Sequence, residues 1–325
     1  MLMGEHAVLH GSRAMVCAVN RRMHIYATRR DDNLLCIESA LGSYREPTSA
    51  PVASSAFRFV LAAVEQMHWR RGLDLRIDSE FSDTIGFGSS AAVTAGVLAA
   101  LTLFRMDDGD EELDRLGLLQ QSAEVIRSVQ TRGSASDAAA SIFGGVIAYR
   151  PTTKVLPLPF RPPISLMYAG YKTPTTEVIA EVAVRFSDEA GQAALERIYG
   201  QMSQATEACI VAWKAEDHDA IAAQFRAYES LMRELGVSDT MTEQLVARLE
   251  AQPDMWAAKI SGSGLGDCVI GVGASTAPDP TAPNPNQLGD SIAADSLGAD
   301  SLAAESFAVE IDPNGLQFEW VSPKS

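Results

Sequence analysis

Two glycine- and serine-rich segments contain the residues best suited to bind phosphate. Residues 86–93 read GFGSSAAV and lead into an apolar, alanine-rich stretch that ends at Phe104, which predicts a loop followed by a helix. Glycine lets a backbone approach an anion, and a helix N-terminus presents unpaired N–H groups and a positive dipole end. The segment lacks the Gly-Lys-Ser/Thr of a Walker loop and the strand–GxGxxG–helix pattern of a dinucleotide site. A turn of small residues that packs a helix fits it equally well.

The second segment is residues 261–267, SGSGLGD, which follow Lys259 and precede a predicted strand from Cys268. A tight hairpin turn would also explain these residues. Two such loops in one chain favour a polyphosphate ligand, because a polyphosphate needs hydrogen-bond donors from more than one side.

A third segment places an acid and a histidine between glycines. Residues 4–11 read GEHAVLHG and stand directly before a predicted strand. Their chemistry alone is ambiguous, since a single histidine is more often a structural residue than a catalytic one. This applies to both His6 and His10.

Composition excludes several classes of protein. The chain has 325 residues, with 26 Lys and Arg against 42 Asp and Glu, so its net charge is −16. Nucleic acids and membrane surfaces are anionic and repel such a chain, so neither is expected as a partner. No apolar run is long enough to span a membrane, and a cytoplasmic protein is expected. The four cysteines are scattered and the histidines form no metal cluster, so zinc and disulfides are not expected.

Hydrophobic periodicity predicts the elements around these motifs. A strand–turn–strand hairpin is expected over 16–29 and 34–38, followed by a helix over 54–69 and a strand over 73–77. A helix over 113–129 precedes the segment RGSASD at 132–137, a further helix and a strand over 146–149. The later elements are a strand over 164–170, helices over 176–186, 189–214, 217–235 and 240–252, and strands over 268–273 and 307–312.

Two stretches are typical of connecting segments. The proline-rich residues 151–163 predict a domain boundary, because proline cannot continue a helix or a central sheet ladder. Residues 274–306 are rich in Pro, Ala and Asn and then repeat every five residues, as DSIAA, DSLGA, DSLAA and ESFAV. They are interpreted as a flexible low-complexity insert between two strands.

The three motifs, in this order, resemble those of the GHMP small-molecule kinase superfamily over nearly the whole chain. GEHAVLHG is similar to the first motif of mevalonate kinases, GFGSSAA to the superfamily's phosphate-binding motif, and KISGSGLGDCVIG to its third motif. Galactokinases typically continue GEH with Thr-Asp, so Ala7 and Val8 favour the mevalonate kinases. Leu9 and the later GSASDAAASIFGG leave phosphomevalonate kinase open as the alternative, together with a sugar kinase of the superfamily.

The resemblance implies an α+β fold of two domains with the active site in the cleft between them. A ribosomal-S5-like, ATP-binding N-terminal domain would cover residues 1–155. A ferredoxin-like α/β domain would cover residues 156–325 and contain the insert. Family members are often dimers, so a homodimer is a further expectation.

The resemblance also implies ATP-dependent phosphorylation of the 5-hydroxyl of mevalonate. Asp137 matches the carboxylate that orients or deprotonates the attacking hydroxyl. Its other implied site residues are Glu5, His6 and Arg132 for the substrate, Gly86, Gly88, Ser89, Ser90 and Ala91 for ATP, and Ser90 and Glu124 for Mg²⁺.

Three departures from the family pattern leave alternatives open. No Pro-Gly-Lys precedes Gly4, so either residues ahead of Met1 or a cation such as Arg132 would supply the positive charge of that lysine. Glu124 lies 137 − 124 = 13 positions before Asp137, further than in typical mevalonate kinases, and a solvated helix carboxylate explains it equally well. Near it, Gln130 stands where the family usually has histidine. The loop before Gly86 is short and lacks the usual proline. A GHMP-fold protein that binds nucleotide without turnover is therefore the alternative from another class.

Overall fold

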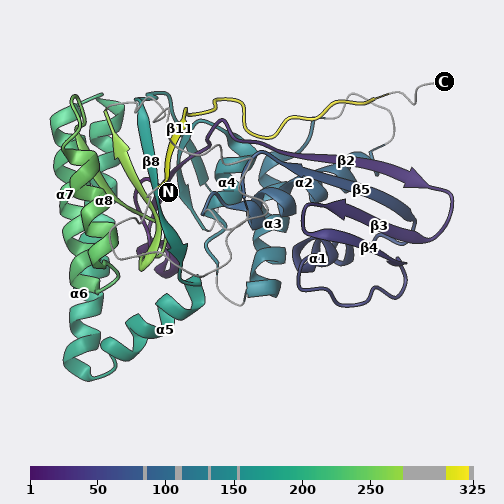
Figure 1. Cartoon of the computed structure of the whole chain (residues 1–325), viewed down its shortest axis with the longest axis horizontal. Coiled ribbons are helices and arrows are strands. Elements are labelled where there is room, and N and C mark those ends of the chain that lie inside the picture. Colours follow the sequence, from purple (N-terminus) through teal and green to yellow (C-terminus); the bar gives the residue numbers. More distant parts are fainter. Residues whose placement is uncertain (83–85, 107–111, 131–132, 152–153, 274–304, 322–325) are drawn as a thin grey trace, which may run out of the picture.

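The protein is an α+β molecule built on three sheets (Figure 1). The computed structural model describes residues 1–325 except 83–85, 107–111, 131–132, 152–153, 274–304 and 322–325. Within the described ranges no helix is both long and apolar enough to cross a bilayer. The expected α+β class is confirmed.

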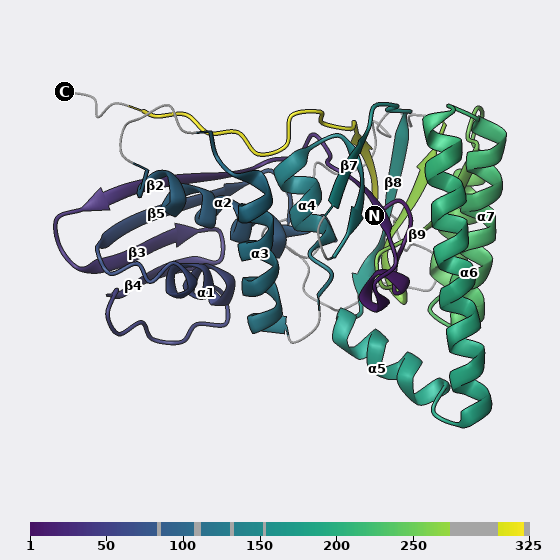
Figure 2. The same ribbon diagram turned by 180° about the vertical axis from the view of Figure 1, so that it is seen from behind.

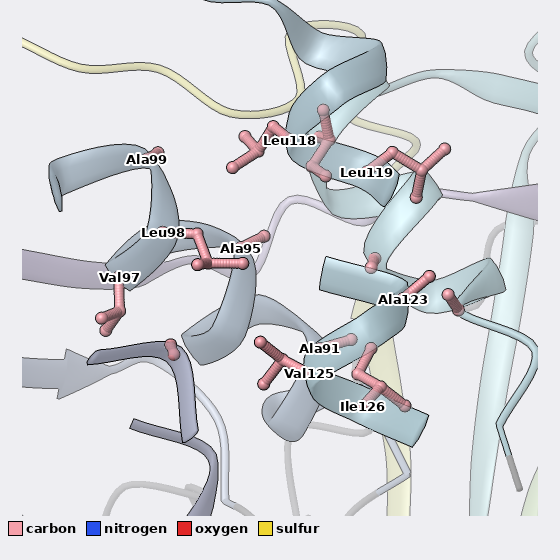
Figure 3. Packing of buried hydrophobic residues seen from close by; sticks show 14 of the residues in the cluster. Ala91, Ala95, Val97, Leu98, Ala99, Leu118, Leu119, Ala123, Val125 and Ile126 are labelled. Carbon is pink, nitrogen blue, oxygen red and sulfur yellow. The ribbon is translucent and has the colours of Figure 1, made fainter. Parts of the chain in front are cut away.

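The first of the three sheets belongs to the N-terminal half and has the strand order β2-β5-β3-β4. Four helices accompany it, and Figure 3 shows the apolar contact between the second and third of them. The strands are β2 (Met23–Arg30), β3 (Leu34–Ser39), β4 (Gly42–Pro47) and β5 (Gly72–Ser79), and the helices are α1 (Arg58–Gln66), α2 (Ser89–Leu103), α3 (Arg115–Gln130) and α4 (Ser136–Phe143).

The expected hairpin of two adjacent strands is wrong. β2 and β3 do follow each other across a short turn, but β5 lies between them, antiparallel to β2 and parallel to β3. Thr28 is thus opposite Asp74 of β5 rather than a residue of β3. Alternation of side chains predicts a strand but not its neighbour, which is decided by where the later strand inserts.

A small second sheet joins the two halves of the chain, with the strand order β1-β6-β7. Its strands are β1 (Ala14–Cys17), β6 (Val146–Arg150) and β7 (Lys154–Leu158). The predicted boundary at 155/156 falls inside β7, which pairs with β6. Pro157 is tolerated there because β7 is an edge strand, where an N–H is not needed on the open side.

The third sheet has the order β11-β8-β10-β9, and helices of the C-terminal half cover one of its faces (Figures 1 and 2). The elements are β8 (Ile164–Lys172), β9 (Ala257–Ser261), β10 (Gly266–Val272), β11 (Glu305–Val309), α5 (Thr175–Arg185), α6 (Glu189–Lys214), α7 (His218–Leu235) and α8 (Thr240–Glu250). Asp188, Asp217 and Asp239 cap α6, α7 and α8 by accepting backbone N–H bonds. Residues 274–304 of the predicted insert (274–306) lie outside the described residues, and its last two residues begin β11.

Two large hydrophobic clusters fill the molecule. One is formed by the N-terminal sheet and helices α1 to α4. The other is formed by the third sheet with α6 and α7, and it also includes Leu2, Met3 and Met15 from the start of the chain and Leu158 from β7. The first motif, residues 4–11, is therefore anchored by residues that pack against the C-terminal half.

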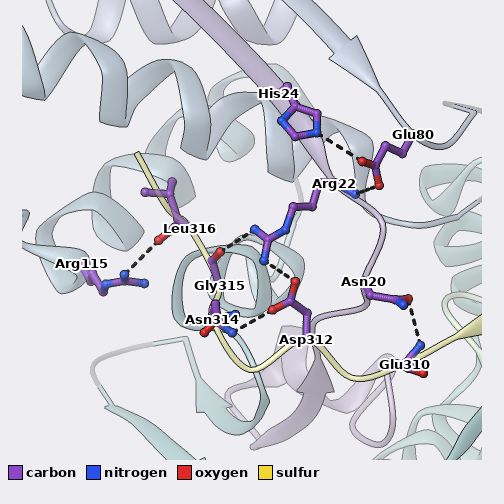
Figure 4. A network of polar contacts seen from close by, with 10 residues as sticks. All are labelled: Asn20, Arg22, His24, Glu80, Arg115, Glu310, Asp312, Asn314, Gly315 and Leu316. Atoms are coloured by element: carbon purple, nitrogen blue, oxygen red, sulfur yellow. Dashed lines mark hydrogen bonds and ion pairs between the residues drawn. The ribbon is translucent and has the colours of Figure 1, made fainter. Parts of the chain in front are cut away.

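The last described residues run from β11 back along the N-terminal half (Figure 2). Figure 4 shows how this segment is attached: Arg22 forms an ion pair with Asp312 and donates to the carbonyl of Gly315 at 3.1 Å. Arg115 of α3 donates to the carbonyl of Leu316 at 2.9 Å. The C-terminal segment thus ties the third sheet to the N-terminal helices.

Candidate active site

The first and third motifs meet in the protein interior. Glu5 is only 3% exposed, and its Oε1 accepts an ion-paired hydrogen bond from Lys259 Nζ at 2.6 Å. Lys259 is fully buried in β9, and its ammonium also donates to the carbonyl of Ile260. The Tyr228 hydroxyl of α7 donates to the carbonyl of Glu5 at 2.8 Å. These contacts hold the first motif against the strand that leads into the third.

His6 connects the same two motifs through its ring. The residue is 6% exposed, and its Nε2 lies 2.9 Å from the carbonyl oxygen of Ser263. A carbonyl only accepts, so Nε2 carries the proton in this contact. Burial lowers the pKa of His6 and outweighs the opposing effects of the Ser263 carbonyl and of Glu5. Contact of Glu5 and His6 with the substrate stays a prediction.

The buried His6 makes a pH dependence of stability expected. The unfolded chain takes up a proton near the ordinary histidine pKa of 6.5, whereas the folded chain does so at lower pH. The unfolded state therefore binds more protons in that window, and the free energy of unfolding falls as the pH drops below 6.5, by at most ~1.4 kcal/mol per pH unit.

Urea unfolding of the wild type and of His6→Gln between pH 8 and pH 5 measures this contribution. Gln retains an N–H donor for Ser263 but does not titrate, so the variant should show the shallower pH dependence. Equal slopes below pH 6.5 would contradict a buried neutral His6.

The segment from Gly86 to Ala91 forms the loop and first turn of α2, as predicted. Gly88 is the N-cap with φ +76, a conformation that favours glycine, and as a glycine it has no side chain with which to cap the helix. Gly86 is packed so closely that a Cβ there would collide with the carboxylate of Asp267. The side chains of Ser89 and Ser90 are partly exposed, whereas Ala91 packs in the N-terminal core (Figure 3).

Asp137 lies beside this loop. It is an exposed residue in the first turn of α4, and a Cβ at Gly88 would lie 3.0 Å from its Cβ. Residue 135 of the preceding turn is an alanine with φ +57, in a region that non-glycine residues seldom adopt. The Ser134 and Ser136 hydroxyls are 2.8 Å apart within the same turn. The structure thus brings the predicted catalytic carboxylate to the predicted phosphate loop.

The contacts of the described residues do not test the two remaining predicted residues, Glu124 and Arg132. The exposed carboxylate of Glu124 in α3 accepts a hydrogen bond from Gln66 at the end of α1. Arg132 lies outside the described residues. Among the residues that the structure describes, no group of three or more His, Cys, Asp or Glu side chains is arranged to hold a metal ion. The roles of Glu124 and Arg132 stay predictions.

Sequence reasoning missed two charged residues at the loop. Asp267 is 5% exposed, and its Oδ2 lies 3.3 Å from the ammonium of Lys172 at the end of β8. Asp267 was visible in the sequence as the end of the SGSGLGD segment, but nothing in the sequence indicated that it would lie against Gly86. Lys172 gave no signal, because only the pairing of β8 with β10 brings it there.

Comparison with known proteins agrees with this geometry. Residues 53–145 match the family described as GHMP kinases N terminal domain. The mevalonate kinase of Archaeoglobus fulgidus is 30% identical over 84% of this chain and 89% of its own length. That of Pyrococcus horikoshii is 28% identical over 83% and 84%. A solved structure titled as a mevalonate kinase superposes with a TM-score of 0.67 at 21% identity, covering 83% of this chain and 87% of that one.

Proposed function

Because this chain belongs to the GHMP kinase family, we propose that it is a mevalonate kinase, which transfers the terminal phosphoryl group of ATP to the 5-hydroxyl of mevalonate. The curated relatives named above carry that activity in their names and align over most of their length. The observation that carries the proposal is the position of Asp137 against Gly88, which places a carboxylate beside a loop suited to phosphate.

The loop residues fit the phosphates of ATP. Gly86 and Gly88 carry no Cβ, which lets the backbone of the loop lie directly against the side chains of Asp267 and Asp137. Gly88 starts a helix of 15 residues, so the positive end of its dipole faces the loop. Ser89 and Ser90, partly exposed in the first turn, would donate hydrogen bonds to phosphate oxygens. Ala91 would contribute by fixing this turn in the core.

Asp137 would act on the acceptor alcohol. Phosphoryl transfer depends mainly on positioning and on electrostatic stabilisation, with little covalent chemistry left to the protein. The exposed carboxylate would accept the hydrogen bond of the attacking hydroxyl, orient its oxygen and take up its proton. Glu5, His6 and Arg132 would bind the substrate, as the family motifs imply.

Mg²⁺ is proposed as the accompanying cation, with Ser90 and Glu124 as its protein ligands. When bound, the ion neutralises charge on the phosphate oxygens. The partly exposed Ser90 hydroxyl suits this role through its position in the first turn of α2. Glu124 would have to exchange its hydrogen bond with Gln66 for the ion.

The experiment that tests the function measures ADP release by the purified protein with ATP and Mg²⁺. Mevalonate, phosphomevalonate and a panel of sugars are supplied in turn as the acceptor. We expect turnover with mevalonate and only background with the others. Turnover confined to phosphomevalonate or to a sugar would replace the proposed acceptor. Nucleotide binding without turnover on any acceptor would contradict the kinase assignment.

A further inference from the structure

Asp267 carries a buried oxygen that the fold leaves without a partner. The residue is 5% exposed, and its Oδ1 has no hydrogen-bond partner among the described residues. A buried carboxylate oxygen is costly unless a donor or a cation meets it. Such an orphaned atom is an indication of a ligand when it faces a binding site.

The two oxygens of Asp267 face different neighbours. Oδ2 pairs with Lys172 Nζ at 3.3 Å and would lie 2.9 Å from a Cβ at Gly262. Oδ1 is the atom that a Cβ at Gly86 would strike first. Lys172 therefore holds one oxygen, and the unpartnered oxygen is turned to the phosphate loop.

Asp267 lies at an irregularity in the pairing of β10 with β8. Gly266 pairs with Lys172 and Cys268 with Tyr168, so Asp267 stands alone in β10 against three residues of β8, and the extra residues belong to β8. The φ of Asp267 is +67, in the left-handed region that Asp and Asn tolerate better than most residues. Bulges commonly redirect a side chain beside an active site.

Charge at the loop decides which ligand suits Oδ1. A phosphate bound at Gly86 would meet an anionic carboxylate, and the single positive charge of Lys172 cannot neutralise both anions. A divalent cation bound between the phosphate and the Asp267 carboxylate would attract both anions and so offset their mutual repulsion. Carboxylate oxygens are the hard ligands that Mg²⁺ and Mn²⁺ accept.

We propose that Asp267 Oδ1 is a ligand of the divalent cation that accompanies ATP, while Lys172 pairs with the other oxygen of the same carboxylate. The inference rests on the nucleotide site of the proposed function. It adds a metal ligand from the third motif, which lies at Gly86, whereas Asp137 lies at Gly88.

The test measures Mn²⁺ binding to the full chain in the presence of ADP, by electron paramagnetic resonance of the free ion. Asp267→Asn keeps the size of the side chain and tolerates the positive φ, but it removes the charge. We expect it to weaken Mn²⁺ binding in the ADP complex at least tenfold. ADP affinity measured in EDTA should stay the same or rise, because the repulsion is removed.

Two further variants complete the test. Asp219→Asn, which removes an exposed carboxylate from the first turn of α7, is the matched control and should leave Mn²⁺ affinity unchanged. Lys172→Gln removes the competing cation, so its Mn²⁺ affinity should be equal to or higher than that of the wild type. The opposite signs expected for Asp267→Asn and Lys172→Gln distinguish a metal ligand from a merely structural ion pair.

Several outcomes would overturn the inference. They are unchanged Mn²⁺ affinity in Asp267→Asn, a parallel loss of metal-free ADP binding in that variant, an equal loss in Lys172→Gln, or a loss confined to Glu124→Gln. No acceptor alcohol is present in the assay. A wild type that binds Mn²⁺ with ADP but phosphorylates no alcohol would overturn the proposed function and leave this inference standing.

Discussion

Asp137→Asn is expected to lower kcat for mevalonate phosphorylation by about 10²–10⁴-fold, the usual range for loss of a positioned acid or base. Asn retains the size of the side chain and can still contact the hydroxyl, but it cannot accept the proton. Asp137 is exposed in the first turn of α4, so its loss should not disturb the core. Steady-state rates and ADP titrations of wild type and variant measure the two effects separately.

The control for this prediction is Asp219→Asn, which removes a carboxylate from the equivalent turn of another helix. It should retain wild-type kcat. ADP affinity of Asp137→Asn should remain near that of the wild type, because the phosphates are assigned to the backbone of the loop and the start of α2. If Asp137→Asn retained more than a tenth of wild-type kcat, a role of Asp137 in the chemical step would be contradicted.

Lys259→Met is expected to destabilise the fold by about 3–5 kcal/mol, the cost of breaking a buried ion pair by removing one partner. Lys259 is fully buried, and Glu5 is 3% exposed with Oε2 already lacking a hydrogen-bond partner among the described residues. The variant leaves an uncompensated carboxylate in the interior. Such a loss is a large part of the ~5–15 kcal/mol that usually stabilises a domain. Urea unfolding monitored by circular dichroism gives the difference.

A double-mutant cycle separates the pair from the packing of the lysine stem. Combining Lys259→Met with Glu5→Gln removes both charges, so the double variant should lose less stability than the sum of the two single variants. If Lys259→Met does not yield folded protein, recovery of folded protein in the double variant tests the same claim. Strict additivity, or a loss below ~1 kcal/mol in Lys259→Met, would contradict a strong buried pair.

Local pattern was sufficient for most helices. The expected helix over 189–214 coincides with α6, and that over 217–235 differs from α7 by one residue at its start. Asp188 and Asp217 stand directly before these helices and cap them, so the start of each helix is marked by a residue next to it in the sequence. The loop before α2 and the start of that helix were likewise predictable, since glycine at 88 and the run of small residues after it are local features.

Features that depend on distant residues were not predictable in this way. β4 and β7 were not expected, and the insertion of β5 between β2 and β3 was missed. The proline-rich stretch 151–163 was interpreted only as a boundary, although residues 154–158 form an edge strand. Substrate contact of Glu5 and His6 stays a prediction, but their contacts to Lys259 and Ser263, more than 250 positions away, depend on the fold and have no signal in the sequence.

The sequence by itself determined the α+β class, the family resemblance, the long helices and the loop from Gly86 to Ser90, because spacing and glycine content act within a few residues. Only the tertiary structure decided that Asp137 lies at Gly88 and that Asp267 lies at Gly86 with Lys172 behind it. The physical reason is that strand pairing and burial join residues far apart in the chain. The partner of a charged side chain is therefore set by tertiary contacts, which a local sequence pattern does not contain.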